Sequence, residues 1–301
     1  MTNDMGDMGL GYAGGSNVPD QLMYPALAQN IVETALPAQV FRQLFVPYPT
    51  KDQSVTIPIE DGSQTAVASR LGEGDEFPLD VSEMTSSTAT VYKIGSGYYI
   101  SKEWIIFQQF PLVQHQLKRL GLKMGNTIDY DCAQLLTNSG ATSTAVTGKS
   151  LGMDMTETTI ASTIGQYDII EAVARMQSVN IFPNTLVVNP TGFSHLRRLP
   201  MYNSQMLYGK PVYQTGEMGH IEGLVVLVSM NCPAGYAFVV NANLSATPLG
   251  QFAPMGYFVE AMPIQTMMRD AVRRDGYEVY ASSLYVPAIT KTDCIQIITY
   301  S

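Results

Sequence analysis

The chain has 301 residues, of which 46% are hydrophobic and only 14% are charged, and its formal net charge is −9. This acidic balance argues against a protein whose main task is to bind nucleic acid, because phosphate contacts need a basic surface. The charged fraction is well below the ~25% of an ordinary globular chain, which indicates a surface largely buried against further copies of the same chain. The length predicts about two domains or one elaborate domain.

The N-terminal region is rich in Gly, Asn and Asp, which predicts a flexible arm over residues 1–20. Apolar residues at helical spacing then predict a helix within Gln21–Phe45, interrupted at Pro37. The N-terminus shows no basic segment followed by an apolar one, and the longest aliphatic run, Leu224–Val228, is too short to cross a bilayer. We therefore expect a soluble protein that is made in a cytoplasm.

An extended hairpin arm is predicted next. Ser54–Glu60 alternates polar and apolar residues, and Thr88–Ser101 returns with a similar alternation, so both segments are expected to be β-strands. Few large apolar side chains lie between them, and that stretch includes the acidic run LGEGDEFPLD. A two-stranded hairpin is only marginally stable alone in water, and a loop of this length is usually functional or disordered. We expect the arm to bury its apolar face against another molecule.

A long helix is predicted directly after the arm, with Ser101 as its N-cap and Pro111 at a restart of the helix. Gly121 and Gly125 lie four residues apart on it and would let another backbone approach closely. Its apolar stripe steps by three or four residues. The stripe consists of Val113, Leu117, Leu120, Met124, Ile128, Cys132 and Leu135.

The rest of the chain mixes short helices and strands without a regular β-α-β alternation, which predicts an α+β protein. A helix is expected over Tyr167–Val179, and another over Pro190–Leu199 with Asn189 or Thr191 as its cap. The first should bury Ile169, Ile170, Val173, Ala174 and Met176. The expected strands are Asn184–Asn189, Leu224–Ser229, Tyr236–Asn241, Tyr257–Glu260, Ile264–Arg269, Tyr277–Tyr280 and Thr292–Thr299.

The sequence contains no catalytic constellation. It has neither a nucleophile elbow nor a phosphate-binding loop, its three histidines are isolated, and its three cysteines lack metal-binding spacing. We therefore expect no enzyme activity, no cofactor and no metal ion, and we expect buried free thiols at all three cysteines. The acids Glu73, Asp75, Glu76 and Asp80 could bind a hard cation, but a solvated acidic loop tip is the preferred interpretation.

Basic residues form two groups in this acidic chain. The first group could receive the acidic arm tip of a neighbouring molecule. It consists of Arg197, Arg198, Arg269, Arg273 and Arg274. The second group, Lys118, Arg119 and Lys123, falls on the polar side of the long helix. A solvated surface is the alternative for both groups.

The order of these parts resembles the Hong Kong 97-type major capsid protein of tailed viruses over nearly the whole chain. The segments that carry the resemblance are VTIPIEDGSQTAVASRLGEGDEFP with its return TATVYKIGSGYYISKEWI, the helix ending in QLLTNSG, YDIIEAVARMQSVNIFPNTLVVNPTGFSHLRRL, and RRDGYEVYASSLYVPAI. None of them is a strict motif by itself. The resemblance implies a flexible N-arm at 1–20, an N-terminal helix region at 21–48, an extended hairpin loop at 49–100, a peripheral domain with the spine helix at 101–154 and 256–301, and an axial domain at 155–255.

The resemblance also implies a coat protein that assembles as hexamers and pentamers into the icosahedral head of a tailed double-stranded DNA virus. Each extended loop would clamp a neighbour, with Glu73, Asp75 and Glu76 on the neighbour's arginines. Lys118, Arg119 and Lys123 would face the packaged DNA. A portal and decoration proteins are expected as partners, together with either a separate scaffolding protein or prior cleavage of a fused scaffolding segment. A membrane is not expected, and the virion shell would be assembled in the host cytoplasm. The alternative is an encapsulin-type compartment, which shares the fold.

Overall fold

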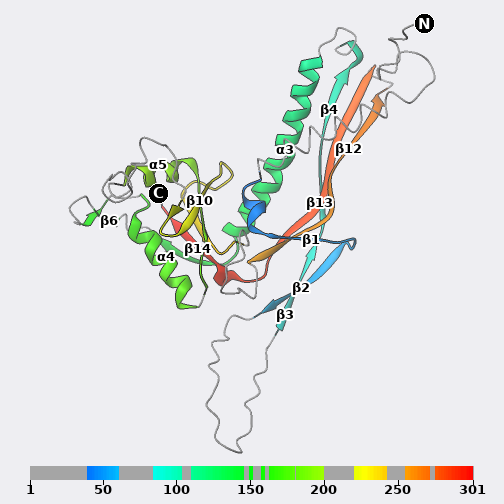
Figure 1. Ribbon diagram of the computed structural model, residues 1–301. Helices are drawn as coiled ribbons and strands as arrows, with labels where there is room; N and C mark the ends of the chain where they lie inside the picture. The colour runs from blue at the N-terminus through cyan, green and yellow to red at the C-terminus, as the bar shows by residue number, and fades with distance from the viewer. Residues whose placement is uncertain are drawn as a thin grey trace, which may run out of the picture.

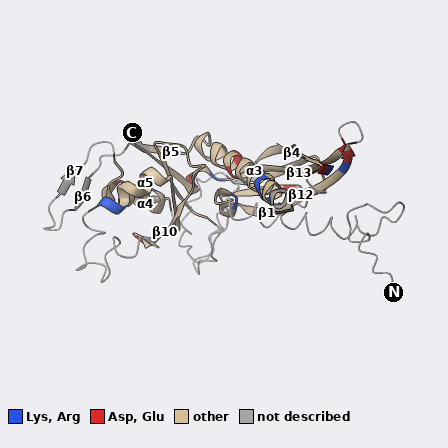
Figure 2. Ribbon diagram, turned by 90° about the horizontal axis from the view of Figure 1, so that it is seen from above, with Lys and Arg blue, Asp and Glu red and all other residues tan. Residues whose placement is uncertain are grey.

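In the computed structural model the described residues are 39–60, 84–103, 110–145, 149–151, 157–159, 163–179, 181–199, 220–242, 255–271 and 275–300. They form an elongated half, in which one long helix lies along a sheet, and a more compact half built on a second sheet (Figures 1 and 2). The predicted N-arm at 1–20, most of the N-terminal helix region and the acidic loop tip lie outside the described residues.

The elongated half is built on a four-stranded sheet in the order β1-β12-β13-β4. Its strands are β1 (Val46–Pro49), β12 (Gly256–Ala271), β13 (Gly276–Ile289) and β4 (Tyr92–Ser101). β1 runs parallel to β12, and the other neighbours are antiparallel. The sequence predicted separate short strands here, but β12 passes Pro263 with register shifts and continues, since a bulge accommodates a residue that has no backbone N–H.

The long helix α3 (Phe110–Thr137) covers one face of this sheet. Leu117, Leu120 and Met124 are buried against Ile100 and Val279 from the sheet. Further along the helix, three residues join the main core, namely Ile128, Cys132 and Leu136. The predicted stripe is confirmed over this length, except that Leu136 is fully buried at its end and Leu135 only partly.

The compact half contains a six-stranded sheet in the order β5-β14-β11-β8-β10-β9. Its strands are β5 (Thr142–Ala145), β14 (Ile295–Thr299), β11 (Tyr236–Val240), β8 (Thr185–Val188), β10 (Leu224–Val228) and β9 (His220–Ile221). β8 lies between β10 and β11, so these two strands, although consecutive in the chain, do not form a hairpin. β5 and β14 pair within this sheet, whereas the domain bounds implied by the resemblance assign both segments to the peripheral domain. Strand pairing does not by itself define a domain boundary, so these bounds stay a prediction.

Two helices, α4 (Gln166–Ser178) and α5 (Pro190–Arg198), belong to the compact half. On α4, Ile169 and Met176 are buried as predicted, but Ile170 is 38% exposed and Ala172 is buried instead. Ala174 is also exposed. The buried positions follow a spacing of three and four residues, which turns positions 170 and 174 to the other side. The structure also contains a small sheet of β6 (Lys149–Leu151) and β7 (Glu157–Thr159) and two short 3-10 helices, η3 (Phe41–Leu44) and η5 (Thr292–Cys294).

The cap of α5 ties the end of the chain to the compact half. Asn189 Oδ1 accepts a hydrogen bond from the Gly192 N–H at 2.6 Å, which confirms Asn189 as the N-cap. The same oxygen accepts the Tyr300 hydroxyl, also at 2.6 Å. One side chain therefore both begins a helix and holds the residue that follows β14.

Candidate functional site: the root of the arm and a basic helix face

The arm consists of β2 (Ser54–Glu60) and β3 (Met84–Thr90), which pair antiparallel over seven residues. The sequence predicted one return strand over Thr88–Ser101, and this is wrong in its pairing. The return changes partner at Val91, and the residues after it form β4, which pairs with β13. β2 has seven residues and can pair with only seven residues of the return segment. The remaining residues of that segment pair with β13 in the four-stranded sheet.

The base of the arm is buried against its own chain. Ile57 and Val91 are 5% and 7% exposed and pack with the fully buried Val259 of β12. Val55 and Ala89 add partly buried contacts on the same face of the arm. We expected the whole apolar face of the arm to be buried against another molecule, and this is wrong at the base of the arm. There the apolar side chains of the arm pack on the outer face of the four-stranded sheet of the same chain.

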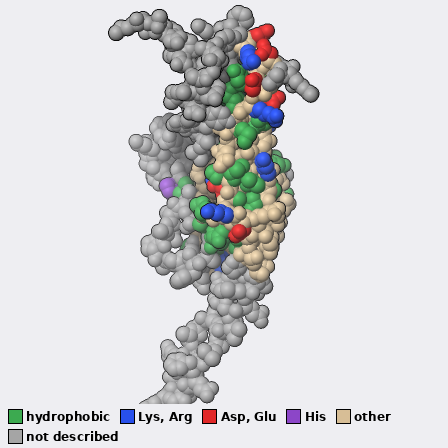
Figure 3. Space-filling view, turned by 90° about the vertical axis from the view of Figure 1, so that its right-hand side faces the viewer, with side chains coloured by type: hydrophobic (Ala, Val, Ile, Leu, Met, Phe, Trp, Pro, Cys, Tyr) green, Lys and Arg blue, Asp and Glu red, His purple; other side chains and the backbone are tan. Residues whose placement is uncertain are grey.

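Beyond the arm's base, this outer face of the sheet stays uncovered by the described residues. Met267 is 66% exposed and Tyr280 is 42% exposed, and the two lie opposite each other in the β12–β13 ladder. Tyr280 is in turn opposite Gly97, where an added Cβ would come within 2.7 Å of the tyrosine ring. Seen from the side, the elongated half carries hydrophobic side chains along its length, interspersed with Lys and Arg (Figure 3). We call the surface formed by Met267, Tyr280 and Gly97 the open sheet face.

Asp131 on α3 connects the helix to the root of the arm. Its Oδ2 accepts hydrogen bonds from the Tyr285 hydroxyl at 2.6 Å and from the Tyr92 hydroxyl at 3.1 Å. The two tyrosine rings are 5.1 Å apart, and Tyr285 stacks on Phe258 at 5.2 Å. Burial, and then the nearby Asp131 carboxylate, raise the pKa of both tyrosines well above the usual value, so both hydroxyls remain donors.

Asp129, two residues earlier, is fully buried and joins three parts of the chain. Its Oδ1 accepts the Phe41 N–H at 2.5 Å, and its Oδ2 accepts the Asn231 side-chain amide at 2.9 Å and the Ser229 hydroxyl at 3.2 Å. Burial raises the pKa of Asp129, although these hydrogen bonds partly offset that effect. Neither Asp129 nor Asp131 is among the residues that the sequence predicts to be functional. The missed signal is a carboxylate directly beside the apolar stripe.

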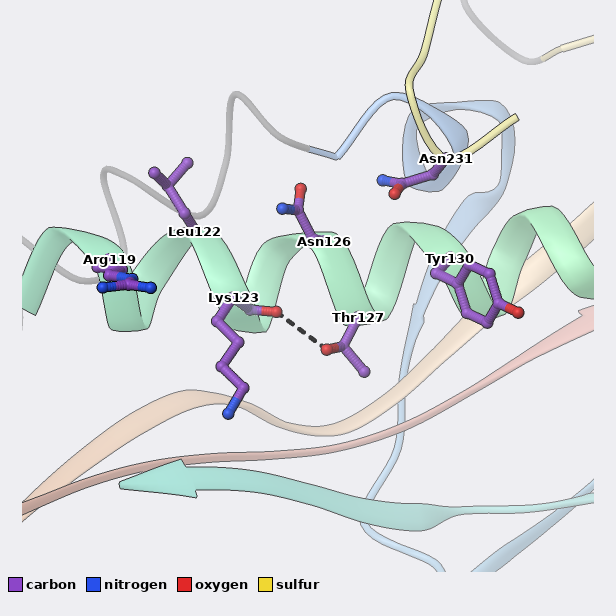
Figure 4. A pocket seen from close by; sticks show the side chains of 7 residues that line it. All are labelled: Arg119, Leu122, Lys123, Asn126, Thr127, Tyr130 and Asn231. Carbon is purple, nitrogen blue, oxygen red and sulfur yellow. Dashed lines mark hydrogen bonds between the residues drawn. The ribbon is translucent and has the colours of Figure 1, made fainter. Parts of the chain in front are cut away.

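The predicted basic residues of α3 are brought together by the structure. Lys118, Arg119 and Lys123 are all exposed on one stretch of the helix. Arg119 and Lys123 line an open hollow of about 540 Å³. The other lining residues are Leu122, Asn126, Thr127, Tyr130 and Asn231 (Figure 4). Thr127 Oγ1 donates to the Lys123 carbonyl at 2.9 Å. Two cations with uncharged neighbours, and no acid among the described lining residues, suit an anionic ligand.

The arginines proposed to receive the acidic tip are not brought together. Arg197 and Arg198 lie in the last turn of α5 in the compact half. Arg269 lies near the C-terminal end of β12, where it is exposed opposite Glu278. The remaining residues of this prediction, Arg273, Arg274, Glu73, Asp75 and Glu76, lie outside the described residues, as does the candidate cation ligand Asp80.

The residues that could carry chemistry are dispersed. Among the described ranges, no three His, Cys, Asp or Glu side chains are placed to hold a metal ion. The three thiols are free and buried as predicted, and burial raises the pKa of Cys232 to about 12 and that of Cys294 to about 11. The His195 ring lies edge-on to the Tyr300 ring, with 5.9 Å between the ring centroids, and burial followed by the charge of Arg198 lowers the pKa of His195. No described helix is long and apolar enough to span a membrane.

A family model described as phage capsid protein matches residues 84–298 of the chain. No curated protein sequence matches the chain. The match includes the return strand of the arm, the long helix and most of the two larger sheets, but not β1 or β2.

Solved structures share the fold at low sequence identity. The capsid of cyanophage P-SCSP1u superposes with a TM-score of 0.63 at 14% identity, covering 88% of each chain. A structure of Mycobacterium phage Che8 gives 0.60 at 14% identity, covering 86% of this chain and 90% of that one. A virus-like particle from Pyrococcus furiosus gives 0.58 at 10% identity, covering 92% and 99%. These likenesses confirm the α+β fold of the Hong Kong 97 type that the resemblance implied.

Proposed function

This chain belongs to the phage capsid protein family, and from that premise we propose how a major capsid protein of this kind builds its shell. Copies of the chain assemble as hexamers and pentamers into an icosahedral head around double-stranded DNA, and the β2–β3 arm of each copy clamps a neighbour. The encapsulin-type alternative is not favoured, because the matching family model is that of phage capsid proteins.

The observation that carries the clamp is a sheet face that its own arm covers only in part. The base of the arm buries Ile57 and Val91 on this face, whereas Met267 and Tyr280 further along are exposed. A neighbour's arm laid on the open sheet face would bury these side chains. A few hundred Å² of apolar burial at ~25 cal/mol/Å² amounts to several kcal/mol before the costs of association, and each shell repeats the contact many times.

The acidic tip of the arm, Glu73, Asp75 and Glu76, is proposed to dock on a neighbour's arginines. Arg269 lies on the same outer face as Met267, because both alternate to one side of β12. It is therefore the candidate best placed for a clamp on the open sheet face. Arg197 and Arg198, in the other half of the molecule, form a separate candidate receptor, and Arg273 and Arg274 follow Arg269 in sequence.

Charge reversal tests this clamp. Replacing Glu73, Asp75 and Glu76 by Lys should sharply lower the yield of closed particles while the subunit keeps its circular dichroism spectrum and unfolding temperature. Arg269→Glu should have the same effect, and combining it with the arm variant should restore part of the yield. Arg197→Glu tests the separate candidate receptor in the compact half, and it should leave the yield unchanged if the open sheet face receives the tip. Normal particles from the triple arm variant would overturn the proposal.

Several further parts of the function follow from family membership. Lys118, Arg119 and Lys123 are proposed to face the packaged genome, which the anion-suited hollow on α3 supports. A separate scaffolding protein, a portal and decoration proteins are proposed to complete a head that is assembled in the host cytoplasm. The role of the chain is structural, and we propose no catalytic step for it.

A further inference from the structure

We propose that Asp131 is a positioning residue for the arm: through Tyr92, its carboxylate sets the direction in which β2–β3 leaves the four-stranded sheet. Because the arm is proposed above as the clamp between subunits, the inference rests on that function. It concerns the single subunit, however, and can be tested without assembly.

At the root of the arm, the return strand changes its pairing partner at a single residue. Before Val91 the strand pairs with β2, and after it the strand pairs with β13. The Val91 N–H donates to the Gln53 carbonyl at 2.9 Å, which closes the arm beyond its last paired residues. Val91 therefore stands between two ladders, and the next residue, Tyr92, is the first that belongs to the sheet.

The side chain of Tyr92 connects the start of β4 to α3, the helix that covers the sheet. Its hydroxyl donates to Asp131 Oδ2 at 3.1 Å, and its ring leans on Tyr285, its partner in the β13–β4 ladder. Tyr285 is fully buried and donates to the same oxygen at 2.6 Å. Asp131 would thus remain held by Tyr285 if the Tyr92 hydroxyl were removed, whereas the root of the arm would lose its tie to α3.

The length of the arm makes this contact important for direction. Seven strand residues at about 3.3 Å each give a lever of about 23 Å. A rotation of about 10° at the root would move the end of such a strand by about 4 Å. That displacement is close to the spacing between neighbouring strands in a sheet, so it would move the arm off its binding position on a neighbour.

The test measures the arm's direction in the full-length, unassembled chain. Spin labels are placed on Ser87→Cys in β3 and Asn126→Cys in α3, two exposed positions, and the three native thiols are buried. Pulsed electron resonance should give a narrow distance distribution with native Tyr92. Tyr92→Phe should broaden it or shift it by several Å. An unchanged distribution would overturn the proposal.

Two further tyrosines separate positioning from general stabilisation. Tyr285→Phe removes the other hydroxyl from the same oxygen, so it should lower the unfolding temperature but leave the arm distribution narrow. Tyr167→Phe, an exposed tyrosine on α4, should change neither. If Tyr285→Phe broadens the distribution as much as Tyr92→Phe does, Asp131 only stabilises the region and the proposal is wrong.

Substitutions of the carboxylate itself complete the test. Asp131→Asn keeps an acceptor oxygen and should retain the narrow distribution, whereas Asp131→Ala should broaden it as Tyr92→Phe does. A narrow distribution in Asp131→Ala would contradict the positioning role. All these outcomes are read in single subunits, so failure of the positioning role would leave the shell-forming function standing, and failure to form shells would leave this measurement valid.

Discussion

Asp129 shows how a single residue couples distant parts of this chain. Its buried carboxylate accepts hydrogen bonds from η3 and from the segment after β10, while it sits on α3 itself. These donors lie 88 to 102 positions away in sequence. No local pattern reveals such contacts, which is why sequence analysis gave no role to Asp129 or to Asp131. The exposure of Lys118, Arg119 and Lys123, by contrast, follows directly from helical periodicity.

The raised pKa of Asp129 leads to a prediction about pH. Because burial raises this pKa, the folded protein keeps a proton on Asp129 at pH values where the unfolded chain has lost it. The stability of the native protein relative to Asp129→Asn should therefore increase as the pH falls from neutral through the raised pKa, and level off below the ordinary Asp value of ~3.9. Urea unfolding of both proteins across this range measures the difference. A difference that shrinks on acidification would contradict the assignment.

Element by element, agreement between sequence and structure depends on how local the determining contacts are. β2 has the predicted bounds, α4 differs from its prediction by one residue at each end, and α5 differs by one residue at its C-terminal end. Their alternation or helical stripe lies within the segment itself. The partner of the return strand was predicted wrongly because β4 pairs with β13, nearly two hundred residues later. Nothing within Thr88–Ser101 identifies that partner.

The long helix offers a matched pair of leucines for a stability prediction. Leu120 is 5% exposed and packs on the sheet, whereas Leu122 is 43% exposed on the opposite side of α3. Leu120→Ala should lower the free energy of unfolding by about 2–4 kcal/mol, because it leaves a cavity in a packed core. Leu122→Ala should change it by less than ~0.5 kcal/mol. Equal effects in denaturant unfolding would mean that α3 does not bury the face described.

At the scale of the whole molecule, the order of parts in the sequence predicted the fold that the comparisons confirm. An arm, a long helix and a mixed region followed by a terminal sheet were sufficient for this, although no single motif was specific. The composition of the sheets was harder to predict. β14 crosses into the compact half, because a strand as short as Ile295–Thr299 carries no signal for which sheet it joins.

The proposed orientation of α3 toward the genome predicts a difference between empty and filled particles. Amine labelling of Lys118 and Lys123 should fall when DNA fills the shell, because phosphates would cover the basic face. Lys93 is exposed on the other side of the sheet, in β4, and should label equally in both kinds of particle. Equal labelling of all three lysines in empty and filled particles would count against a genome-facing helix.

The most direct test of the central claim is electron cryomicroscopy of particles formed by the purified full-length chain. We expect closed shells in which the β2–β3 arm of each subunit lies over the open sheet face of a neighbour, against Met267 and Tyr280. Shells in which the arm contacts only its own subunit would contradict the proposed clamp.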